Sequence, residues 1–353
     1  MNEINQILAA IKPVDTSLKP AITGHLNQLT KPVGSLGQLE ELAIQYCQIQ
    51  NSVKPVLTKK RIIVFAADHG IAEAGVSAYP SEVTLQMVQN FLSGGAAINV
   101  MAKHINVELN IVDLGVRHTF ENHPFLFKRK IKAGTNNFTL GPAMEQSEAI
   151  QAITTGIEMA ERAYTDGISI LGAGDMGIGN TTASSALYAA LLPCDAGQVT
   201  GLGTGVDQAG LQKKVQIIKK AIEINNQRLT DPVSILAALG GFEIAGICGL
   251  MVGAAAHRIP VVVDGFIASA AALAAIRLNP AVTDYLFWGH MSAENGHQML
   301  FNHLNIKPIL NLNMRLGEGT GAALAMTVIE AAIKIYNEMA TFQSAGVSTK
   351  TGN

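Results

Sequence analysis

The sequence predicts an α/β fold, a doubly wound, Rossmann-like parallel sheet with helices on both faces. Several short runs rich in β-branched residues are apolar throughout, whereas strands with one solvated face alternate apolar and polar residues. Longer amphipathic or alanine-rich segments separate these runs, which gives the strand-helix-strand rhythm of a doubly wound sheet. At roughly 150 residues per domain, the 353 residues suffice for two domains, or for one large domain with an addition.

The expected strands are, in chain order, RIIVFAAD (61–68), VELNIVDLG (107–115), GISILGAG (167–174), RIPVVVDG (258–265) and YLFWGH (285–290). The apolar spacing predicts helices at 81–103, 145–165, 181–192, 208–228, 232–239, 243–256 and 265–277. Residues 1–50 and 322–342 look helical and add no strand. We therefore expect a small helical domain formed from residues 1–50 and 322–353, beside a large α/β domain, residues 51–321, that carries the active site.

Charge and hydropathy argue against two classes of partner. Lys plus Arg number 25 against 27 Asp plus Glu, so the formal net charge is −2, far from the basic excess that nucleic-acid binding usually needs. The apolar stretches 245–256 and 265–276 end in charged residues before the roughly 18 residues that a membrane span requires. Charged residues make up 15% against roughly 25% in typical domains, which indicates surface buried between subunits. We expect an oligomer, with no nucleic-acid or membrane partner.

The cysteines and the N-terminus favour a cytoplasmic protein. Cys47, Cys194 and Cys248 are odd in number and show no C-x-x-C spacing, which argues against a disulfide framework or a structural zinc site. The first residues include Glu3 and contain no uninterrupted apolar region, unlike a signal peptide.

A glycine loop, GAGDMGIGNTTAS (172–184), follows the third expected strand and leads into a helix near Asn180. Glycines let a backbone approach an anion, and the free N–H groups of a helix N-terminus favour a phosphate there. Two other interpretations stay open: glycines that serve only a tight turn, and the dinucleotide fingerprint G-x-G-x-x-G, which Gly172, Gly174 and Gly177 match. The acid near the distance that a dinucleotide site requires, Asp195, lies at a helix end rather than after a strand.

A second glycine loop, TGLGTGVD (200–207), leads into a helix with Lys213 and Lys214 near its start. A lysine at such a position can extend into water along its aliphatic stem. We expect this of one of the two lysines, while the other can reach a phosphate held by the first loop.

A third loop, GHMSAENGH (289–297), contains residue types that bind metals, namely His290, Glu294 and His297. Their spacing does not match H-E-x-x-H, and no fourth ligand presents itself, so we expect no metal. The hydroxyl of Ser292 in the same loop is the better candidate for a ligand contact.

A fourth loop, MRLGEGTGAALAM (314–326), places Glu318 between two glycines before an alanine-rich helix. Glu318 is either a charge that complements the helix dipole or a general base whose pKa an apolar pocket raises. Asp68 and His69, after the first strand, could form a relay, but no serine or cysteine occupies a nucleophile elbow, so covalent catalysis is not supported. Asp264, before a glycine at another strand end, is interpreted mainly as a turn or helix cap.

Seven blocks of the sequence together resemble one family: KPVGSLGQLEELA (31–43), FAADHGIAEAGVSAYPSEVT (65–84), GDMGIGNTTASSA (174–186), GGFEIAGICGLMVGAA (240–255), VVVDGFIASAAALAA (261–275), HMSAENGH (290–297) and MRLGEGTGAALAM (314–326). The family is nicotinate-nucleotide:dimethylbenzimidazole phosphoribosyltransferase. The resemblance runs from about residue 12 to residue 340 in unbroken order. It implies a homodimer that joins 5,6-dimethylbenzimidazole to the ribose of nicotinate mononucleotide in cobalamin lower-ligand assembly, with no metal and no cofactor.

The resemblance also implies roles for individual residues. The family's catalytic base falls on Glu318. Its phosphate- and ribose-binding positions fall on Asp175, Gly177, Asn180, Thr181, Gly205, Lys214 and Ser292, and its base-binding region on Tyr79, Gln86, Met87 and Leu316. Some relatives carry Glu where this chain has Asp175, and the shorter acid is expected to pair with Lys214 less directly. A dehydrogenase and a non-catalytic nucleotide sensor are the alternative functions.

Overall fold

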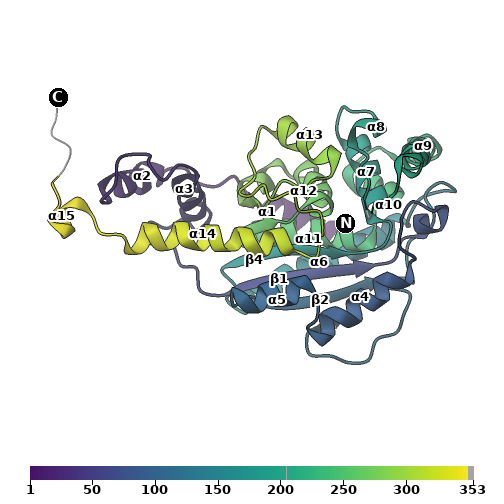
Figure 1. Ribbon diagram of the computed structural model, residues 1–353, viewed down its shortest axis with the longest axis horizontal. Coiled ribbons are helices and arrows are strands. Elements are labelled where there is room, and N and C mark those ends of the chain that lie inside the picture. Colours follow the sequence, from purple (N-terminus) through teal and green to yellow (C-terminus); the bar gives the residue numbers. More distant parts are fainter. Residues whose placement is uncertain (204, 349–353) are drawn as a thin grey trace.

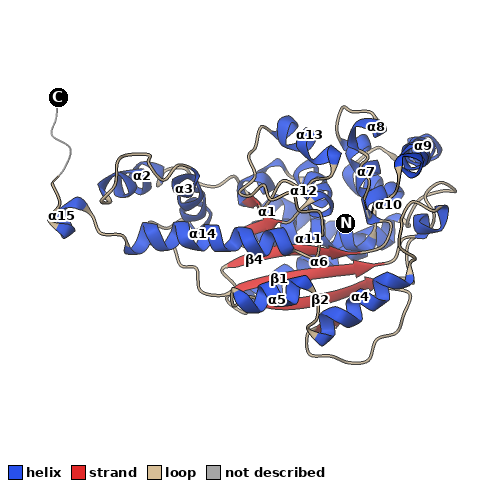
Figure 2. Ribbon diagram, in the orientation of Figure 1, coloured by secondary structure: helices blue, strands red, loops and turns tan. Residues whose placement is uncertain are grey.

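The computed structural model describes residues 1–203 and 205–348, and its described residues form one six-stranded parallel sheet (Figure 2). The strands are β1 (Lys60–Ala67), β2 (Glu108–Gly115), β3 (Leu126–Lys128), β4 (Ile170–Met176), β5 (Val261–Val263) and β6 (Leu286–Trp288). Their order, β3-β2-β1-β4-β5-β6, is that of a doubly wound sheet, with the topological switch between β1 and β4. The predicted fold class is confirmed.

The strand predictions differ from the structure at the two edges of the sheet. Strand β3 was not expected, because its three residues, Leu-Phe-Lys, contain no β-branched run. The ranges 258–265 and 285–290 were too long, since the paired strands there each have three residues. Strands β3 and β6 form the two edges of the sheet, and β5 lies between β4 and β6. Strands of three residues leave too little apolar sequence to mark where they begin and end.

The helices follow the expected alternation with the strands. Their bounds are α1 (Asn2–Ala10), α2 (Lys19–Gln28), α3 (Gln38–Gln50), α4 (Glu82–Ser93), α5 (Ala97–His104), α6 (Gln146–Thr165), α7 (Asn180–Leu191), α8 (Ala196–Val199), α9 (Gln208–Asn225), α10 (Pro232–Leu239), α11 (Phe242–Ala256), α12 (Phe266–Leu278), α13 (Asn295–Leu304), α14 (Thr320–Glu338) and α15 (Phe342–Ala345). Short 3₁₀ turns span Gly70–Ala74, Asn226–Arg228 and Pro280–Tyr285. None of the helices in the described part of the chain is long and apolar enough to cross a membrane.

The prediction of one helix over 81–103 was wrong. Helix α4 ends at Gly94, which has a left-handed backbone with φ of 80°, a conformation that glycine adopts without the steric cost of a Cβ. The N–H groups of Gly94 and Gly95 bond back to the carbonyls of Phe91 and Asn90. The chain therefore turns before it starts α5.

Helices cover both faces of the sheet (Figure 1). Ile62 of β1 packs against Gly319, which caps α14, whereas Phe65 contacts Gly246 of α11. Side chains three apart on a strand point to opposite faces, so α14 and α11 lie on opposite sides. Helix α11 is buried almost all round because α6 covers it from outside, and Gly156 lets the two helices approach so closely that a Cβ there would collide with the backbone of α11.

Helices α2 and α3 from the N-terminal part of the chain and α14 and α15 from the C-terminal part lie together at the left of Figure 1. Helices α2 and α3 pack with each other, α3 packs along α14, and Leu29 pairs with Thr341 in an isolated bridge. Helix α1 instead contacts α11, while α14 also contacts β4 and β5. The division into residues 1–50 plus 322–353 and residues 51–321 stays a prediction, and its last residues, 349–353, lie outside the described residues.

Candidate active site

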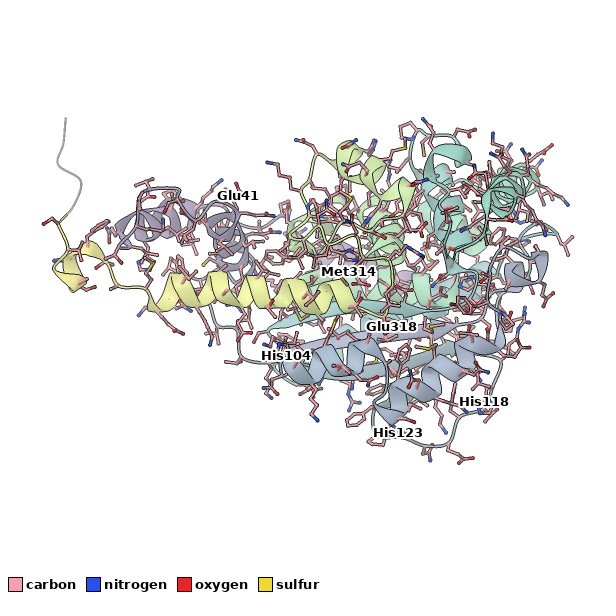
Figure 3. All side chains as sticks on the ribbon, viewed as in Figure 1. Glu41, His104, His118, His123, Met314 and Glu318 are labelled. Carbon is pink, nitrogen blue, oxygen red and sulfur yellow. The ribbon has the colours of Figure 1, made fainter. Side chains whose placement is uncertain are left out.

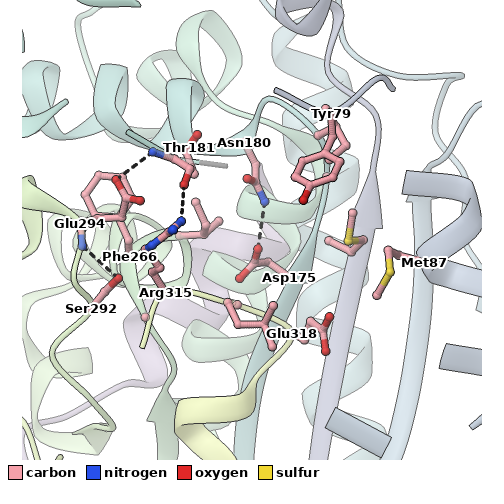
Figure 4. A pocket seen from close by; sticks show the side chains of 18 of the residues that line it. Tyr79, Met87, Asp175, Asn180, Thr181, Phe266, Ser292, Glu294, Arg315 and Glu318 are labelled. Carbon is pink, nitrogen blue, oxygen red and sulfur yellow. Dashed lines mark hydrogen bonds between the residues drawn. The ribbon is translucent and has the colours of Figure 1, made fainter. Parts of the chain in front are cut away.

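A pocket of about 500 Å³ opens at the carboxyl ends of β4, β5 and β6, the edge where doubly wound sheets bind ligands. Six segments line it: the loop and start of α7 after β4, the loop of Gly203, the segment after β5, the segment after β6, the loop before α14, and α4 with the loop before it (Figure 4). Glu318 lies near the middle of the view in Figure 3, whereas His104 lies at the end of α5 and His118 and His123 lie below α4, away from it.

The glycines that match the dinucleotide fingerprint do not form a phosphate loop together. Gly172 and Gly174 lie inside β4. A Cβ at Gly174 would lie 2.5 Å from the carbonyl oxygen of Glu318, and one at Gly172 would lie 2.8 Å from Ile62. These two glycines are therefore small because the loop and helix that follow Glu318 pack directly on the strand, which removes the geometric basis of the dinucleotide interpretation.

The predicted phosphate loop does end in a helix N-terminus inside the pocket. Helix α7 begins at Asn180 after the left-handed Gly179, and Gly177, Asn180 and Thr181 line the pocket. The Asn180 side-chain amide donates to Asp175 Oδ2 at 2.9 Å (Figure 4). Burial raises the pKa of the Asp175 carboxyl well above its ordinary value, and the nearby Asp264, Glu243 and Glu318 charges raise it further.

Lys214 lies behind the start of α7, is fully buried and is not among the residues that line the pocket. Its ammonium donates to Thr181 Oγ1 at 2.9 Å and to the Gly201 carbonyl at 3.3 Å. Burial lowers the pKa of Lys214 to about 8, while the Glu294 carboxylate opposes that shift. The carboxylate that acts on Lys214 is therefore that of Glu294, whereas Asp175 is hydrogen-bonded to Asn180. Lys213 is exposed, as expected for one of the two lysines.

The second glycine loop reaches the pocket through Gly203. Its N–H donates to Glu294 Oε2 at 3.3 Å, and its carbonyl accepts from Arg315 Nη1 at 2.9 Å (Figure 4). Gly203 has φ of +56°, and a Cβ there would lie 2.8 Å from Thr181 Oγ1. Gly205 is exposed and is not among the residues that line the pocket. Residue 204, between them, lies outside the described residues.

Ser292 lines the pocket and is held by the start of the next helix. The Ser292 N–H donates to His297 Nδ1 at 2.8 Å, so His297 Nε2 carries the proton and donates to Ser269 Oγ at 2.9 Å. Burial lowers the pKa of His297 to about 3, which keeps the ring neutral. His297 therefore supports the loop, and the described residues contain no cluster of three metal-binding side chains.

Glu318 is buried, with 5% of its surface exposed, and lines the pocket. Its backbone is left-handed, with φ of +63°, which is costly for a residue other than glycine. Burial raises the pKa of its carboxyl, the N–H of Ile98 lowers it by donating to Oε2 at 3.3 Å, and the Asp264 charge raises it again. A buried carboxylate with a raised pKa at a pocket wall has the properties of a general base.

The predicted base-binding residues divide into two groups. Tyr79, Met87 and Leu316 line the pocket, and Tyr79 and Leu316 are 56% and 57% exposed. Gln86 lies on an exposed face of α4 and is not among the lining residues. Neighbouring residues on a helix point in directions about 100° apart, so Gln86 and Met87 do not both face the pocket.

Asp68 and His69 do not form the relay considered above. Asp68 Oδ2 accepts from the N–H of Arg117 at 2.8 Å, whereas His69 Nε2 pairs with Glu243 Oε1 at 2.6 Å, and both partners are fully buried. A Cβ at Gly177 would lie 3.1 Å from His69 Nε2. The His69–Glu243 pair therefore supports the glycine loop from beneath.

Comparison with known proteins gives consistent matches over the whole chain. A family model described as a phosphoribosyltransferase matches residues 11–347. The nicotinate-nucleotide–dimethylbenzimidazole phosphoribosyltransferase of Chlorobaculum parvum is 55% identical over 349 residues, 99% of each chain, and that of Prosthecochloris aestuarii is 53% identical over 351 residues, 99% of each chain. The crystal structure of CobT from Thermus thermophilus has a TM-score of 0.89 and 43% identity, and the match covers 98% of this chain and 100% of that one.

Proposed function

The chain belongs to the nicotinate-nucleotide–dimethylbenzimidazole phosphoribosyltransferase family, and from that membership we propose that it transfers the phosphoribosyl group of nicotinate mononucleotide to 5,6-dimethylbenzimidazole. The products are nicotinate and α-ribazole 5′-phosphate, the nucleotide of the cobalamin lower ligand. The observation that carries the proposal is one pocket with two unlike ends. At one end Thr181, at the N-terminus of α7, separates the pocket from the buried ammonium of Lys214, and at the other end lies the buried carboxyl of Glu318.

The phosphate is proposed to bind at the Lys214 end. There the N-terminus of α7 supplies backbone N–H groups and a favourable dipole, and Thr181 and Ser292 supply hydroxyls. Lys214 now bonds to a hydroxyl and a backbone carbonyl, which are weaker partners for an ammonium than a phosphate oxygen. Asp175 and Asn180, between this end and Glu318, are proposed to contact the ribose.

The two rings are proposed to occupy the other end, one on each side of the ribose. Tyr79, Met87 and Leu316 supply the apolar contacts for the benzimidazole. Attack from the face opposite the leaving group converts the β-linkage of the substrate into the α-linkage of the product. Holding the phosphate firmly fixes C1′ between the rings, so binding energy remote from the reacting atoms is used for positioning.

One base is sufficient for this reaction. The pyridine nitrogen bonded to C1′ in nicotinate mononucleotide is cationic, so the C1′–N bond breaks with its electron pair to the ring, which leaves without needing a proton. The lone pair of one benzimidazole nitrogen forms the new bond to C1′, and the ring becomes cationic. The proton on its second nitrogen then passes to the Glu318 carboxylate, whose raised pKa strengthens it as a base.

The assembly and location of the protein are part of the same proposal. A homodimer fits the low charged fraction, 15%, and the exposed apolar side chains such as Val33 and Leu140. A cytoplasmic location fits the three free cysteines, of which Cys47 and Cys248 are buried. The substrates are small molecules, and we propose neither a nucleic-acid nor a membrane partner.

The test is an incubation of the purified protein with nicotinate mononucleotide and dimethylbenzimidazole, followed by chromatography of nicotinate and of the nucleotide product. Equal amounts of nicotinate and ribazole phosphate, both dependent on the benzimidazole, are expected. Nicotinate release without the benzimidazole would indicate a hydrolase, and tight binding without release would indicate a nucleotide sensor. Either result contradicts the proposal.

A further inference from the structure

Asp264 caps a helix distant in sequence. It follows β5, only 1% of its surface is exposed, and it is not among the residues that line the pocket. Its Oδ2 accepts the N–H of Gly319 at 3.2 Å, and its Oδ1 accepts the N–H of Ala322 at 2.9 Å. The carboxylate thus satisfies donors in the first turn of α14, not of α12, which follows it in the chain.

The turn that Asp264 holds has a strained backbone at Glu318, the proposed base. Gly317, Glu318 and Gly319 all have left-handed backbones, with φ of 83°, 63° and 88°. Two glycines adopt this conformation freely, but for a glutamate it is strained and persists only where its surroundings fix it. The peptide N–H that Asp264 accepts belongs to the residue directly after Glu318, so the bond acts on the strained unit itself.

We propose that Asp264 is a positioning residue for the transfer reaction: from behind the pocket, its carboxylate fixes the left-handed turn that aims Glu318 at the substrate, and it places a negative charge beside that base. This inference rests on the proposed role of Glu318. Asp264 itself touches no substrate, since it lies outside the pocket wall.

The charge of Asp264 gives the proposal a signature that a purely structural role lacks. Its charge raises the pKa of Glu318, as expected of a like charge nearby. Other charged or titratable groups also face this cluster: Asp175 from β4, whose own pKa the Glu318 and Asp264 charges raise, and His290 after β6, whose Nε2 lies 4.0 Å from Asp264 Oδ1. Loss of the Asp264 charge alone therefore lowers the pKa of Glu318.

The test compares Asp264→Asn with a matched control, Asp231→Asn. Asp231 caps α10 through the N–H groups of Val233 and Ser234 and is not among the residues that line the pocket. For Asp264→Asn we expect a kcat loss of about 10²-fold, as for a misplaced catalytic group, with KM values for both substrates changed less than threefold. The acid limb of its kcat–pH profile should move to lower pH, because Glu318 then stays deprotonated to a lower pH. Asp231→Asn should lower Tm but leave kcat and the acid limb of the pH profile unchanged.

A second variant separates position from charge. Asp264→Glu keeps the charge but moves the carboxylate by one methylene, so kcat should fall while the acid limb stays in place. Three results would each overturn the proposal. The first is a wild-type kcat and acid limb in Asp264→Asn, and the second is a full kcat in Asp264→Glu. The third is failure of both variants to fold while Asp231→Asn folds. Glu318→Gln is measured in parallel, because activity in that variant would refute the base assignment itself rather than the role of Asp264.

Discussion

The two ends of the pocket are built differently. At the phosphate end, Lys214, Thr181 and Gly203 are linked through hydrogen bonds and contacts to Glu294 and Arg315, and Lys214 is fully buried. At the base end the walls are apolar, and two of the side chains there, Tyr79 and Leu316, are more than half exposed. The first end is organised before any ligand arrives, whereas the second end is open.

This difference separates two tasks. A preorganised polar site loses little freedom on binding and recognises one charged group strictly. An open apolar site discriminates weakly, since a methyl group in a hydrophobic pocket is worth only roughly 1 to 3 kcal/mol. The structure thus predicts strict recognition of the phosphate and permissive recognition of the base, with Glu318 at the base end acting on the reaction and not on binding.

The largest expected effect tests whether Glu318 acts on the reaction step and not on the binding of either substrate. Glu318→Gln keeps the shape and the Ile98 contact but cannot accept a proton, so kcat should fall by roughly 10²- to 10⁴-fold. The Kd values for both substrates, measured by calorimetry, should change less than threefold. In the wild type, kcat should decline as the pH falls through the raised pKa of Glu318, because the protonated acid accepts no proton. Wild-type turnover in the folded variant would refute the assignment.

A smaller effect tests the phosphate end. Lys214→Met keeps the buried volume and removes the ammonium, so KM for nicotinate mononucleotide should rise about 10- to 150-fold, the equivalent of a lost charged hydrogen bond of roughly 1.5–3 kcal/mol. The affinity for the unphosphorylated riboside should hardly change. Lys213→Met, the exposed neighbour, is the control and should be silent. Equal losses for both ligands would make Lys214 a purely structural residue.

The pH dependence sharpens the same comparison. The pKa of Lys214 is lowered to about 8, so its ammonium is present below that pH and is lost above it. The wild-type KM for nicotinate mononucleotide should therefore rise as the pH passes 8, approaching tenfold per pH unit. This rise should be absent in Lys214→Met, and KM for the benzimidazole should not follow it.

The sequence predicted the parts of this site that depend on local signals. The long apolar runs of β1 and β4 have neighbours on both sides in the sheet, so their sequences identify them, and the loops after β4 and β6 carry recognisable glycine and serine patterns. Glu318 was found because a charge between two glycines is unusual. The interpretation of Gly172 and Gly174 as a possible dinucleotide loop failed because their role is to admit the Glu318 turn from another part of the chain.

The contacts that the sequence did not predict join residues far apart in the chain. Asp264 was correctly interpreted as a cap, but the helix that it caps starts more than fifty residues later. Glu294 and Arg315 meet at Gly203 from two different loops. Such contacts leave no local pattern, because hydrogen bonds between distant loops depend on how the sheet brings strand ends together.

The smallest expected effect lies at the base end, where two adjacent residues give opposite predictions. Met87 lines the pocket and Gln86 does not, although the family resemblance assigns both to base binding. Met87→Ala removes part of an apolar wall that is already partly open to water, so KM for dimethylbenzimidazole should rise by less than about tenfold, or about 1 kcal/mol. Gln86→Ala should leave KM unchanged, since its side chain lies on the exposed face of α4.

Steady-state kinetics with dimethylbenzimidazole and unsubstituted benzimidazole measure both effects, and Met87→Ala should narrow the preference between the two bases. A larger loss in Gln86→Ala than in Met87→Ala would mean that α4 turns its other face to the base when substrates bind, and the open end would then be organised by the ligand.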